Sequence, residues 1–529
     1  MNRKIYLKIL LGIVTFVLLI FFLSTVIIEP WIGKKIQSAL NEKNKDYLFE
    51  IKKVHILMFR SGIELGNITI CSKQEHAGTR DLKGEIASIK FKGFKLVKAL
   101  FKKDIEIREV SISNISVKGK IQFSGKAKPP IVSPYNIQIG KILFDKINLL
   151  IGSTSSAEFY SVKESVLKVY NLQIGKHDTI ALGMVKQFDF KAKELQSVSS
   201  DSMYSYTANG IIYSATLNSL AVNSFSIHPN YQNYNFTSRY RYATDRTEAR
   251  FANIYFHDFS ASAFFKCRSM LCSYIEIGKM DVNDFIDLRK EFRHINKPAF
   301  QDIFYNYPEA INIDSICLIR GNIIYIEHAK DANKPGSISF NEINAKIYKI
   351  SNALIYKTKS ASSELKGEAL LMGKSKMTIL LKVKLFDRYN TFLLNGTLSG
   401  LEAKELNPIL EKNAYIYVTS GKIDAMKFSF ISNNSKSTGN MTLLYHGLDI
   451  TVKNKRTDDT TAFKERLISL IANKKIINSN PIPGENVRVG IVDYKRDPER
   501  FLFNYCFKSI LSGMTSSLTN NPKKKKIDK

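Results

Sequence analysis

Cysteine and proline, which cross-link or stiffen small secreted domains, are scarce in this chain, and so is tryptophan. The chain has 13 prolines and one tryptophan in 529 residues, which excludes a proline-rich stalk. The cysteines are odd in number and irregularly spaced, so no disulfide framework follows. A Cys267–Cys272 disulfide would close a small loop, but we favour buried free thiols. The five cysteines are Cys71, Cys267, Cys272, Cys317 and Cys506.

Sequence motifs of catalysis are also missing. No G-x-S-x-G, G-x-x-x-x-G-K-[ST], G-x-G-x-x-G or C-x-x-C motif occurs. The eight histidines are scattered, and no two have the i, i+4 spacing of a zinc-protease helix. His257 and Asp258 are adjacent, but nothing in the sequence places a nucleophile beside them. We therefore expect that the protein is not an enzyme and has no catalytic residue, metal site or cofactor.

Negative charge is in short supply. Lys+Arg number 78 against 48 Asp+Glu, a formal net charge of +30. Such a balance suits an anionic partner, either nucleic acid, an anionic membrane surface or acidic glycolipid. A general lysine-rich composition is the alternative. Aromatic and basic residues alternate in the segment 235–250, as they do in single-strand binding sites. We favour a strand with one aromatic and one charged face, and expect no nucleic-acid partner.

A membrane anchor is predicted at the N-terminal end. Ile9–Ile28 is a run of twenty residues without a charge, and such a helix crosses a bilayer core of about 30 Å. Trp31 lies where an interfacial aromatic residue is expected. The alternatives are a buried helix and a cleaved signal peptide, but no small-residue cleavage site precedes Glu29. The anchor residues that we single out are Ile9, Leu10, Phe16, Leu19, Phe22, Ile28 and Trp31.

The flanks of this span give its orientation. Basic residues lie on both sides, with Lys34 and Lys35 after the span, so the charge rule is weak here. A short basic N-terminus before one early span favours placing the bulk outside the cytoplasm. Ile32, Ile36 and Leu40 then have helical spacing. They predict a short amphipathic helix, which is either an ordinary first helix or one that lies against lipid headgroups.

From about Phe49 onward the hydrophobic period changes to two, which is typical of strands with one apolar face. A motif I-x-I-x-x-φ-x-φ, with φ apolar, recurs at Ile105–Ile112, Ile137–Phe144 and Ile311–Leu318. Its two middle residues would shift the alternation, as a bulge or short turn does, and the motif reads as one strand-turn-strand unit used many times. Counting roughly fifteen residues per strand and turn predicts about thirty strands. The candidate lipid-facing strand residues are Ile89, Phe91, Ile105, Ile107, Ile379, Leu381 and Val383.

Breaks in this pattern suggest the domain organisation. Lys126–Ser133 holds the Pro-Pro pair and is the best linker candidate. Asn283–Ile295 has one apolar face at helical spacing, and Pro298 follows it, so we predict a connecting helix. Leu96–Phe101 and Phe463–Ile471 read as further short helices. The predicted regions are an anchor at 1–30, β regions at 31–128, 129–282 and 301–497, a connecting helix at 283–300, and a C-terminal helix with a basic tail at 498–529.

Several segments together resemble AsmA-like proteins of Gram-negative envelopes. The resemblance lies in Phe49–Thr69, Glu85–Lys118, Gly321–Phe340, Asn395–Leu410, Ser420–Phe430 and Gly439–Ile450, with the helix at the C-terminal end. It implies one inner-membrane anchor and a periplasmic β-groove of the bridge-like lipid-transfer type. That groove would carry phospholipid acyl chains toward the outer membrane. The family has no catalytic residues, so none are carried over.

The sequence thus predicts a mainly β protein. We expect a long twisted antiparallel sheet that forms an elongated groove, one N-terminal transmembrane helix and a few short amphipathic helices. The expected partners are phospholipid acyl chains, the inner membrane and envelope proteins at the outer membrane. The expected function is phospholipid transport between the two membranes or outer-membrane homeostasis. The alternatives are a structural or regulatory factor for outer-membrane protein assembly, and an anchored hydrolase with a clustered polar site.

Overall fold

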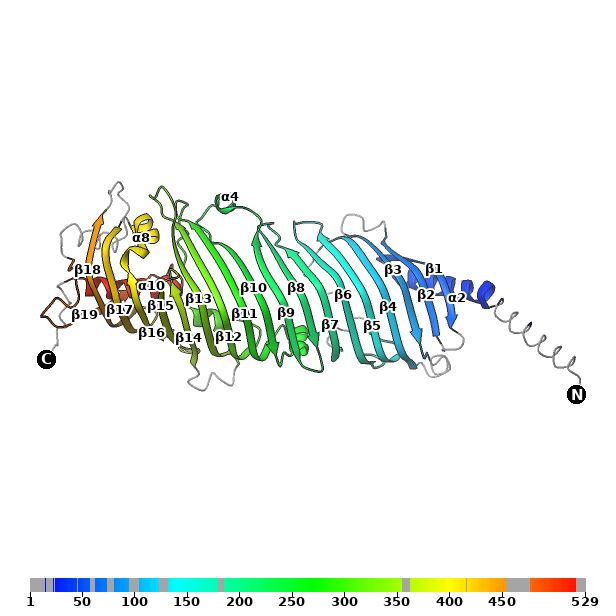
Figure 1. Ribbon diagram of the computed structural model, residues 1–529. Helices are drawn as coiled ribbons and strands as arrows, with labels where there is room; N and C mark the ends of the chain where they lie inside the picture. Colours follow the sequence, from blue (N-terminus) through cyan, green and yellow to red (C-terminus); the bar gives the residue numbers. More distant parts are fainter. Residues whose placement is uncertain are drawn as a thin grey trace, which may run out of the picture. The chain divides into compact units, whose positions relative to one another are not determined.

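The computed structural model describes most of the chain and shows a mainly β protein (Figure 1). Its 19 strands belong to one mixed sheet. The chain divides into two compact units, unit 1 at Met1–Asn223 and unit 2 at Ser224–Lys529. The described residues are 15, 22, 24–44, 46–57, 62–73, 80–94, 104–122, 132–178, 185–353, 362–414, 416–452 and 476–519.

Unit 1 begins with a helical segment and continues in strands. A π-helical turn η1 (Ser24–Ile28) leads directly into α2 (Glu29–Lys43). This helix confirms the short helix that the spacing of Ile32, Ile36 and Leu40 predicted. The strands are β1 (Tyr47–Leu57), β2 (Gly62–Ser72), β3 (Arg80–Lys92), β4 (Asp104–Ile121), β5 (Asn136–Ser153), β6 (Phe159–Ile174), β7 (Gln187–Val198), β8 (Tyr204–Ser214) and β9 (Ser219–Pro229), the last crossing into unit 2.

Unit 2 combines further strands with short helices. Its strands are β10 (Arg246–His257), β11 (Met270–Asp287), β12 (Ile311–His328), β13 (Gly336–Ser351), β14 (Ser362–Leu371), β15 (Ser375–Lys384), β16 (Phe392–Glu402), β17 (Ile416–Ser432), β18 (Lys436–Val452) and β19 (Val489–Lys495). Its helices are α4 (Asn233–Thr237), α5 (Ala261–Cys267), α6 (Phe300–Tyr305), η5 (Ala403–Leu406), α8 (Asn407–Ala414) and α10 (Leu502–Ser517). The C-terminal helix is therefore confirmed.

The sheet is mixed, so the prediction of an antiparallel sheet is wrong at two places. β4 pairs with β5 in parallel, from Asp104↔Asn136 onward. β11 pairs with β12 in parallel, from Met270↔Ile311 onward. Parallel neighbours need a connection that returns to the starting end of the first strand, which a tight hairpin turn cannot provide. The connections 122–135 and 288–310 are long enough to do so.

The strands are fewer and longer than the sequence count of about thirty. The described residues form 19 strands, and β4, β5, β11 and β12 each run for 18 residues. The interrupted motif explains the difference. In the ladders that contain this motif, no register partner is assigned to Arg108, Gly140 or Asp314. The paired residues before and after each of them keep the same register. The two middle residues of the motif therefore bend a strand that continues, instead of ending it.

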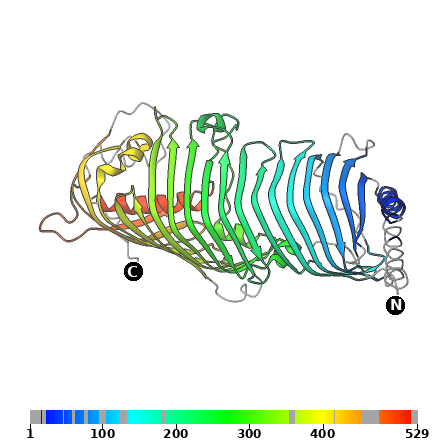
Figure 2. The same cartoon turned by 45° about the vertical axis from the view of Figure 1, so that its right-hand side comes forward.

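Helix α2 closes the free edge of β1 in unit 1. Backbone N–H groups of the strand donate to α2 side chains: Phe49 to Asn41 Oδ1 at 2.7 Å, Ile51 to Gln37 Oε1 at 3.0 Å and Ile56 to Glu29 Oε1 at 2.7 Å. The three acceptors are four or eight residues apart on one helix face. An open strand edge would offer these donors to another chain, and α2 occupies them (Figure 2).

Helix α10 does the same for β19 in unit 2. The N–H groups of Ile491 and Asp493 donate to Ser516 Oγ at 3.0 Å and to Ser512 Oγ at 3.2 Å. The neighbouring helix face packs on β18 and β19 on the inner side of the curved C-terminal strands (Figure 2). Gly513 permits this approach, since a Cβ there would lie within 3.1 Å of Met441 and Val492 atoms.

The predicted connecting helix at Asn283–Ile295 is wrong. β11 continues to Asp287 with both neighbours paired, Val282 opposite Ala249 and Ile323. Two complete hydrogen-bonded ladders outweigh the modest helix preference of this segment. Phe285, which helical spacing placed on an apolar helix face, is 1% exposed and packs edge-on against Tyr234, with ring centroids 5.2 Å apart.

The remaining boundary predictions have mixed outcomes. The division between the compact units falls at residues 223 and 224, and not at the predicted connecting helix. Most of the linker candidate Lys126–Ser133 lies outside the described residues, as do the predicted helices Leu96–Phe101 and Phe463–Ile471. Ser133, at the linker's end, is fully buried and donates through its hydroxyl to the Tyr135 carbonyl at 2.7 Å.

Candidate functional site: an apolar face in unit 1

Apolar side chains line up in rows that cross unit 1 from strand to strand. Residues opposite one another in a ladder project from the same face of a sheet. One row is Ile56, Ile63, Phe91, Val110, Ile142, Val169 and Phe188. The next is Val54, Leu65, Ile89, Ile112, Phe144, Leu167, Phe190 and Tyr213. We call the surface made by these two rows and their same-face neighbours the apolar face.

The opposite side of the same strands is polar. The row between the two apolar rows is His55, Glu64, Lys90, Ser111, Leu143, Lys168 and Asp189. Lys90 and Glu64 form an ion pair at 3.1 Å there, and Lys92 pairs with Glu109 at 2.8 Å. Hydrogen bonds from Lys92 and Ser111 hold the pKa of the Glu109 carboxyl below its ordinary value. This side is a solvated surface.

Exposure varies along the apolar face: Val110 and Val169, the neighbours of Ile142 in its row, are buried at 6% and 4%, whereas β5 between them is half-buried. β5 places seven large apolar side chains on it, and every one is intermediate in exposure: Ile137, Ile139, Ile142, Phe144, Ile147, Leu149 and Ile151. A second layer of structure would bury such residues almost completely. In the described part of unit 1 the only helix beyond η1 is α2, which packs on β1. There Ile32 and Ile36 cover Val54, Leu65 and Ile68, all buried.

A line of left-handed residues keeps the apolar face continuous along the strands. Asn67, Asn114 and Lys146 have φ of 52°, 53° and 52°. Each stands between two apolar residues three positions apart, such as Leu65 and Ile68. Strict alternation would send the second one to the polar side. The additional bulge residue restores it to the apolar side, where Ile68, Ile86, Ile115 and Ile147 are register partners.

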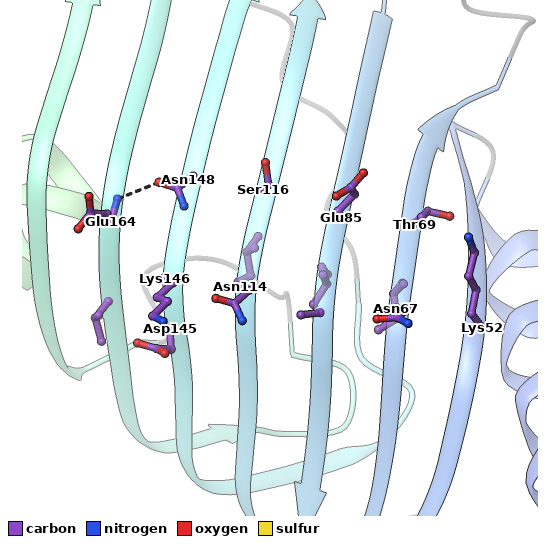
Figure 3. A pocket seen from close by; sticks show the side chains of 15 residues that line it. Lys52, Asn67, Thr69, Glu85, Asn114, Ser116, Asp145, Lys146, Asn148 and Glu164 are labelled. Atoms are coloured by element: carbon purple, nitrogen blue, oxygen red, sulfur yellow. Dashed lines mark hydrogen bonds between the residues drawn. The ribbon is translucent and has the colours of Figure 1, made fainter.

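The same bulges leave a hollow of about 1020 Å³ on the polar side (Figure 3). It is lined by side chains one position away from the apolar rows, including Thr69, Glu85, Ser116 and Asn148. Acids and lysines alternate along it, and many of its side chains are exposed: Lys52, Asn67, Glu85, Asn114, Lys146, Asn148 and Glu164. Ile68, Ile86, Ile115 and Val166 also border this open trough, so its lining mixes charged and apolar groups.

The predicted strand residues fall into two groups. Ile89 and Phe91 lie in the apolar rows. Ile105 and Ile107 continue the apolar face toward one end, opposite Ile137 and Ile139. The other three belong to unit 2, on β15: Ile379 and Leu381 are half-buried, whereas Val383 is 5% exposed within a closed core.

The predicted anchor residues are only partly described. Ile9, Leu10, Phe16 and Leu19 lie outside the described residues. Phe22, Ile28 and Trp31 are exposed, at 59%, 43% and 61%. Among the helices described here, none is long and apolar enough to cross a bilayer. The described part of the chain therefore leaves the anchor as a prediction.

Unit 2 carries a closed core where unit 1 has an open face. Its members come from β14–β19, α10 and the residue after α10, and include Phe392, Leu394, Phe428, Phe430, Met441, Leu443, Val492 and Tyr505. Phe392 meets Tyr505 of α10 edge-on, with ring centroids 5.9 Å apart. Burial of the Tyr505 hydroxyl raises its pKa to about 12. α10 thus covers an apolar surface of the same alternating kind.

A cluster of acids at one end of β10–β12 was not anticipated from the sequence. Burial, with Asp284 nearby, raises the pKa of Asp245 to about 6. Burial also raises the pKa of Asp284, which accepts a hydrogen bond from the Thr247 hydroxyl at 2.5 Å. Glu327 accepts from Tyr325 Oη at 2.8 Å and from Asn413 Nδ2 at 3.0 Å. Only strand register and α8 bring these residues together, so no local sequence signal could reveal them.

The remaining candidate residues form no reactive site. All five cysteines are free, and burial raises the pKa of Cys272 to about 11. Buried His328 has both ring nitrogens engaged, with Tyr234 Oη at 2.9 Å and with the Ala332 carbonyl at 2.7 Å. The residues that the structure describes contain no group of three His, Cys, Asp or Glu side chains arranged to hold a metal ion.

Comparison with known proteins gives no family assignment. No protein-family model matches the chain, and no curated protein matches it. The resemblance to AsmA-like proteins therefore stays a prediction from short sequence segments.

Proposed function

We propose that this protein is a lipid-handling envelope protein whose apolar face in unit 1 holds acyl chains. In this proposal the face forms a groove, an N-terminal span anchors the chain in the inner membrane of a Gram-negative bacterium, and the bulk lies in the periplasm. The protein takes part in phospholipid transport between the inner and outer membranes or in outer-membrane homeostasis. The observation that carries the proposal is the half-exposure of the seven apolar side chains that β5 places on the apolar face.

The energetics favour an apolar ligand on this surface. Covering apolar surface is worth about 25 cal/mol per Å², and soluble proteins rarely leave a large contiguous patch uncovered. A row across eight strands at about 4.8 Å each is on the order of 35 Å long. An acyl chain in a bilayer extends about 15 Å, half of a core of about 30 Å. A chain lying along a row fits within it, and the polar side keeps the sheet soluble.

The chemistry of the face also matches a lipid chain. The two apolar rows carry no charged side chain and only one hydroxyl, that of Tyr213. A ligand with many hydrogen-bonding groups would lose its water there without compensation. An acyl chain has no hydrogen bonds to water that it would lose. A row of similar apolar side chains can bind it at many positions. Such a surface suits binding with low chemical selectivity along the chain.

The test uses two neighbouring substitutions on β5. Ile142 and Leu143 are adjacent, both half-buried, and project from opposite sides of the sheet. The full chain is purified in mild detergent and co-purifying phospholipid is quantified by mass spectrometry. Ile142→Asp is expected to reduce bound lipid about tenfold, because a carboxylate on the apolar face is costly to cover. Leu143→Asp is the matched control and is expected to keep the lipid.

Equal lipid content in the parent chain and both variants would contradict the proposal, as would a parent chain that carries no lipid. Thermal unfolding of both variants checks that each is folded. Loss of lipid from Leu143→Asp alone would place the ligand on the polar side and would also overturn it.

A further inference from the structure

Unit 2 exposes large apolar side chains on two short helices at one end of its strands. They are Phe264 and Phe265 on α5, Phe300, Ile303 and Tyr305 on α6, and Tyr307 just after α6, exposed at 39%, 55%, 42%, 49%, 52% and 47%. We call this set the aromatic rim. The apolar face of unit 1 plays no part in it. Scattered exposed apolar residues need no explanation, but a cluster on consecutive helices does.

Backbone and amide hydrogen bonds join the chain segments that follow these two helices. The residue that begins β11, Met270, donates to the Ala310 carbonyl at 2.8 Å. Asn352, at the end of β13, donates to the carbonyls of Tyr307 at 3.2 Å and Glu309 at 2.8 Å. The chain that follows α5 and the chain that follows α6 therefore lie side by side. The two helices therefore lie at the same end of β11 and β12.

The buried sides of these helices fix which residues face outward. In α6, Gln301 and Phe304 are buried, and Gln301 Nε2 donates to the Thr391 carbonyl at 3.3 Å. The exposed Phe300 and Ile303 are three positions apart, and the Phe300 ring also stacks on the ring of buried Phe304, with centroids 6.1 Å apart. In α5, Ser260 caps the first turn through Ala263 N at 3.3 Å and Ala261 is buried. The packing of α5 and α6 in the fold therefore decides which of their side chains are exposed.

The charges around the rim point to an anionic partner. Lys266 and Arg268 follow Phe265 directly and are exposed, and α5 contains no acidic residue. The Lys297 ammonium, just before α6, lies 5.0 Å from the Phe501 ring centroid. The acid on α6, Asp302, is turned inward, accepting hydrogen bonds from Ala299 N at 3.2 Å and from Asn390 Nδ2 at 3.1 Å. Asp258 before α5 and Glu309 after Tyr307 also lie beside the rim, so its three cations outnumber two acids.

We infer that the aromatic rim is a docking surface for an anionic lipid bilayer. Phe and Tyr side chains with cations beside them suit the headgroup level of a membrane, where rings meet the acyl boundary and cations meet phosphate. Each Lys or Arg near an anionic surface contributes about 1 kcal/mol. The rim is a second membrane contact, on unit 2, and is independent of the span predicted at the N-terminal end.

The test measures capture of a second membrane. The full chain is reconstituted in donor proteoliposomes, and fluorescent acceptor vesicles of phosphatidylglycerol and phosphatidylethanolamine are added and recovered with the donors. A variant with Phe264→Ser, Phe265→Ser, Phe300→Ser and Ile303→Ser is expected to lose about tenfold in capture. The matched control carries Leu48→Ser, Leu150→Ser, Ile212→Ser and Leu217→Ser, exposed apolar residues of unit 1 that lie off its apolar rows. It is expected to capture normally.

Two further readouts separate the possible results. Lys266→Gln with Arg268→Gln is expected to weaken capture at low salt and to leave little difference at high salt, where screening is strong. Equal capture by the rim variant and its control would overturn the inference. So would capture of pure phosphatidylcholine vesicles at the same level, or a rim-dependent dimer of the chain in light scattering. Lipid co-purified with the rim variant is expected to match the parent, so failure here leaves the proposed function separately testable.

Discussion

Strands β5 and β17 have nearly the same length and the same alternation, yet they end in different environments. β5 has 18 residues and keeps its apolar side chains half-exposed. β17 has 17 residues and buries its own, with Phe428 and Phe430 both 1% exposed. The difference lies in what covers each strand. η5 and α8 pack on β17, and α10 packs on β18 and β19 and adds Tyr505 to the core that holds Phe428 and Phe430. No described helix packs over β5 in unit 1.

Small residues make the closed packing possible. The Phe428 ring occupies the space above Gly396, and Phe430 packs on Gly439, where an added Cβ would meet backbone. Gly513 brings α10 close to Met441 and Val492. The two apolar rows of unit 1 contain no glycine. A row of uniformly large side chains makes a broad surface, whereas alternating large and small ones interlock with a partner layer.

The largest expected effect comes from removing a core ring of unit 2 and comparing it with the open face. Phe428→Ala is expected to lower the free energy of unfolding by about 3–5 kcal/mol, because it leaves a cavity that the packed core cannot close. Phe144→Ala on β5 is expected to cost about 1 kcal/mol or less, since its ring is partly exposed and leaves no cavity. Urea unfolding followed by circular dichroism measures both. Equal losses would show that the two surfaces are covered alike.

The next effect concerns pH and distinguishes the acids of the two units. Asp245 in unit 2 has a pKa of about 6, raised from 3.8 by burial, so the folded state binds its proton more tightly than the unfolded state. Its contribution to stability is present below pH ~4 and is lost as pH rises through about 6, by up to about 3 kcal/mol. Asp245→Asn is expected to remove this loss and to gain stability relative to the parent above pH 6.

The polar side of unit 1 supplies the opposite case. Hydrogen bonds from Lys92 and Ser111 lower the pKa of Glu109, so its contribution is present at neutral pH and is lost on acidification. The Glu109→Gln variant is expected to be less stable than the parent at neutral pH. This difference in the free energy of unfolding is expected to shrink as the pH falls below the ordinary range for a glutamate. Chemical unfolding between pH 4 and 8 checks both variants. A pH-independent difference for Asp245→Asn would contradict the assignment of a buried proton to that site.

The smallest expected effect concerns the two closed sheet edges. Gln37→Ala with Asn41→Ala frees two N–H donors of β1, and Ser512→Ala with Ser516→Ala frees two of β19. Each lost hydrogen bond is expected to cost about 1 kcal/mol. Hydrogen exchange is expected to accelerate at Phe49 and Ile51 in the first variant and at Ile491 and Asp493 in the second. Unchanged exchange at these amides would mean that the helices do not protect the edges.

The sequence predicted a mainly β chain, although the expected count of about thirty strands exceeds the 19 that the described residues form. Period-two alternation at Ile89 and Phe91 identified residues of the apolar rows, since alternation follows directly from the pleat. The I-x-I-x-x-φ-x-φ interruptions were interpreted as bulges or short turns between strands, but the strands continue through them. The parallel pairs β4–β5 and β11–β12 were not predicted, because pairing between strands depends on contacts that no local pattern records.

Local periodicity failed where tertiary pairing decided the structure. Helical spacing over Asn283–Ile295 predicted a helix, yet along β11 the strand β12 pairs with the first five of these residues and β10 with the first three. Val383 was placed with the lipid-facing residues on the same alternation as Ile107, although α10 belongs to the core that contains it. Alternation predicts which side of a strand a residue lies on. Whether that side is covered depends here on a helix more than a hundred residues away in sequence.

The central claim is that the apolar face of unit 1 carries lipid chains while the similar surface of unit 2 is closed by its own helix. The most direct measurement places the photoreactive amino acid p-benzoylphenylalanine at Phe144, at Leu143 and at Phe430 in the full chain, in cells, and follows irradiation by mass spectrometry of the purified protein. The account predicts a phospholipid adduct at position 144 and none at 143 or 430. Equal adducts at the three positions, or an adduct at 430 with none at 144, would contradict it.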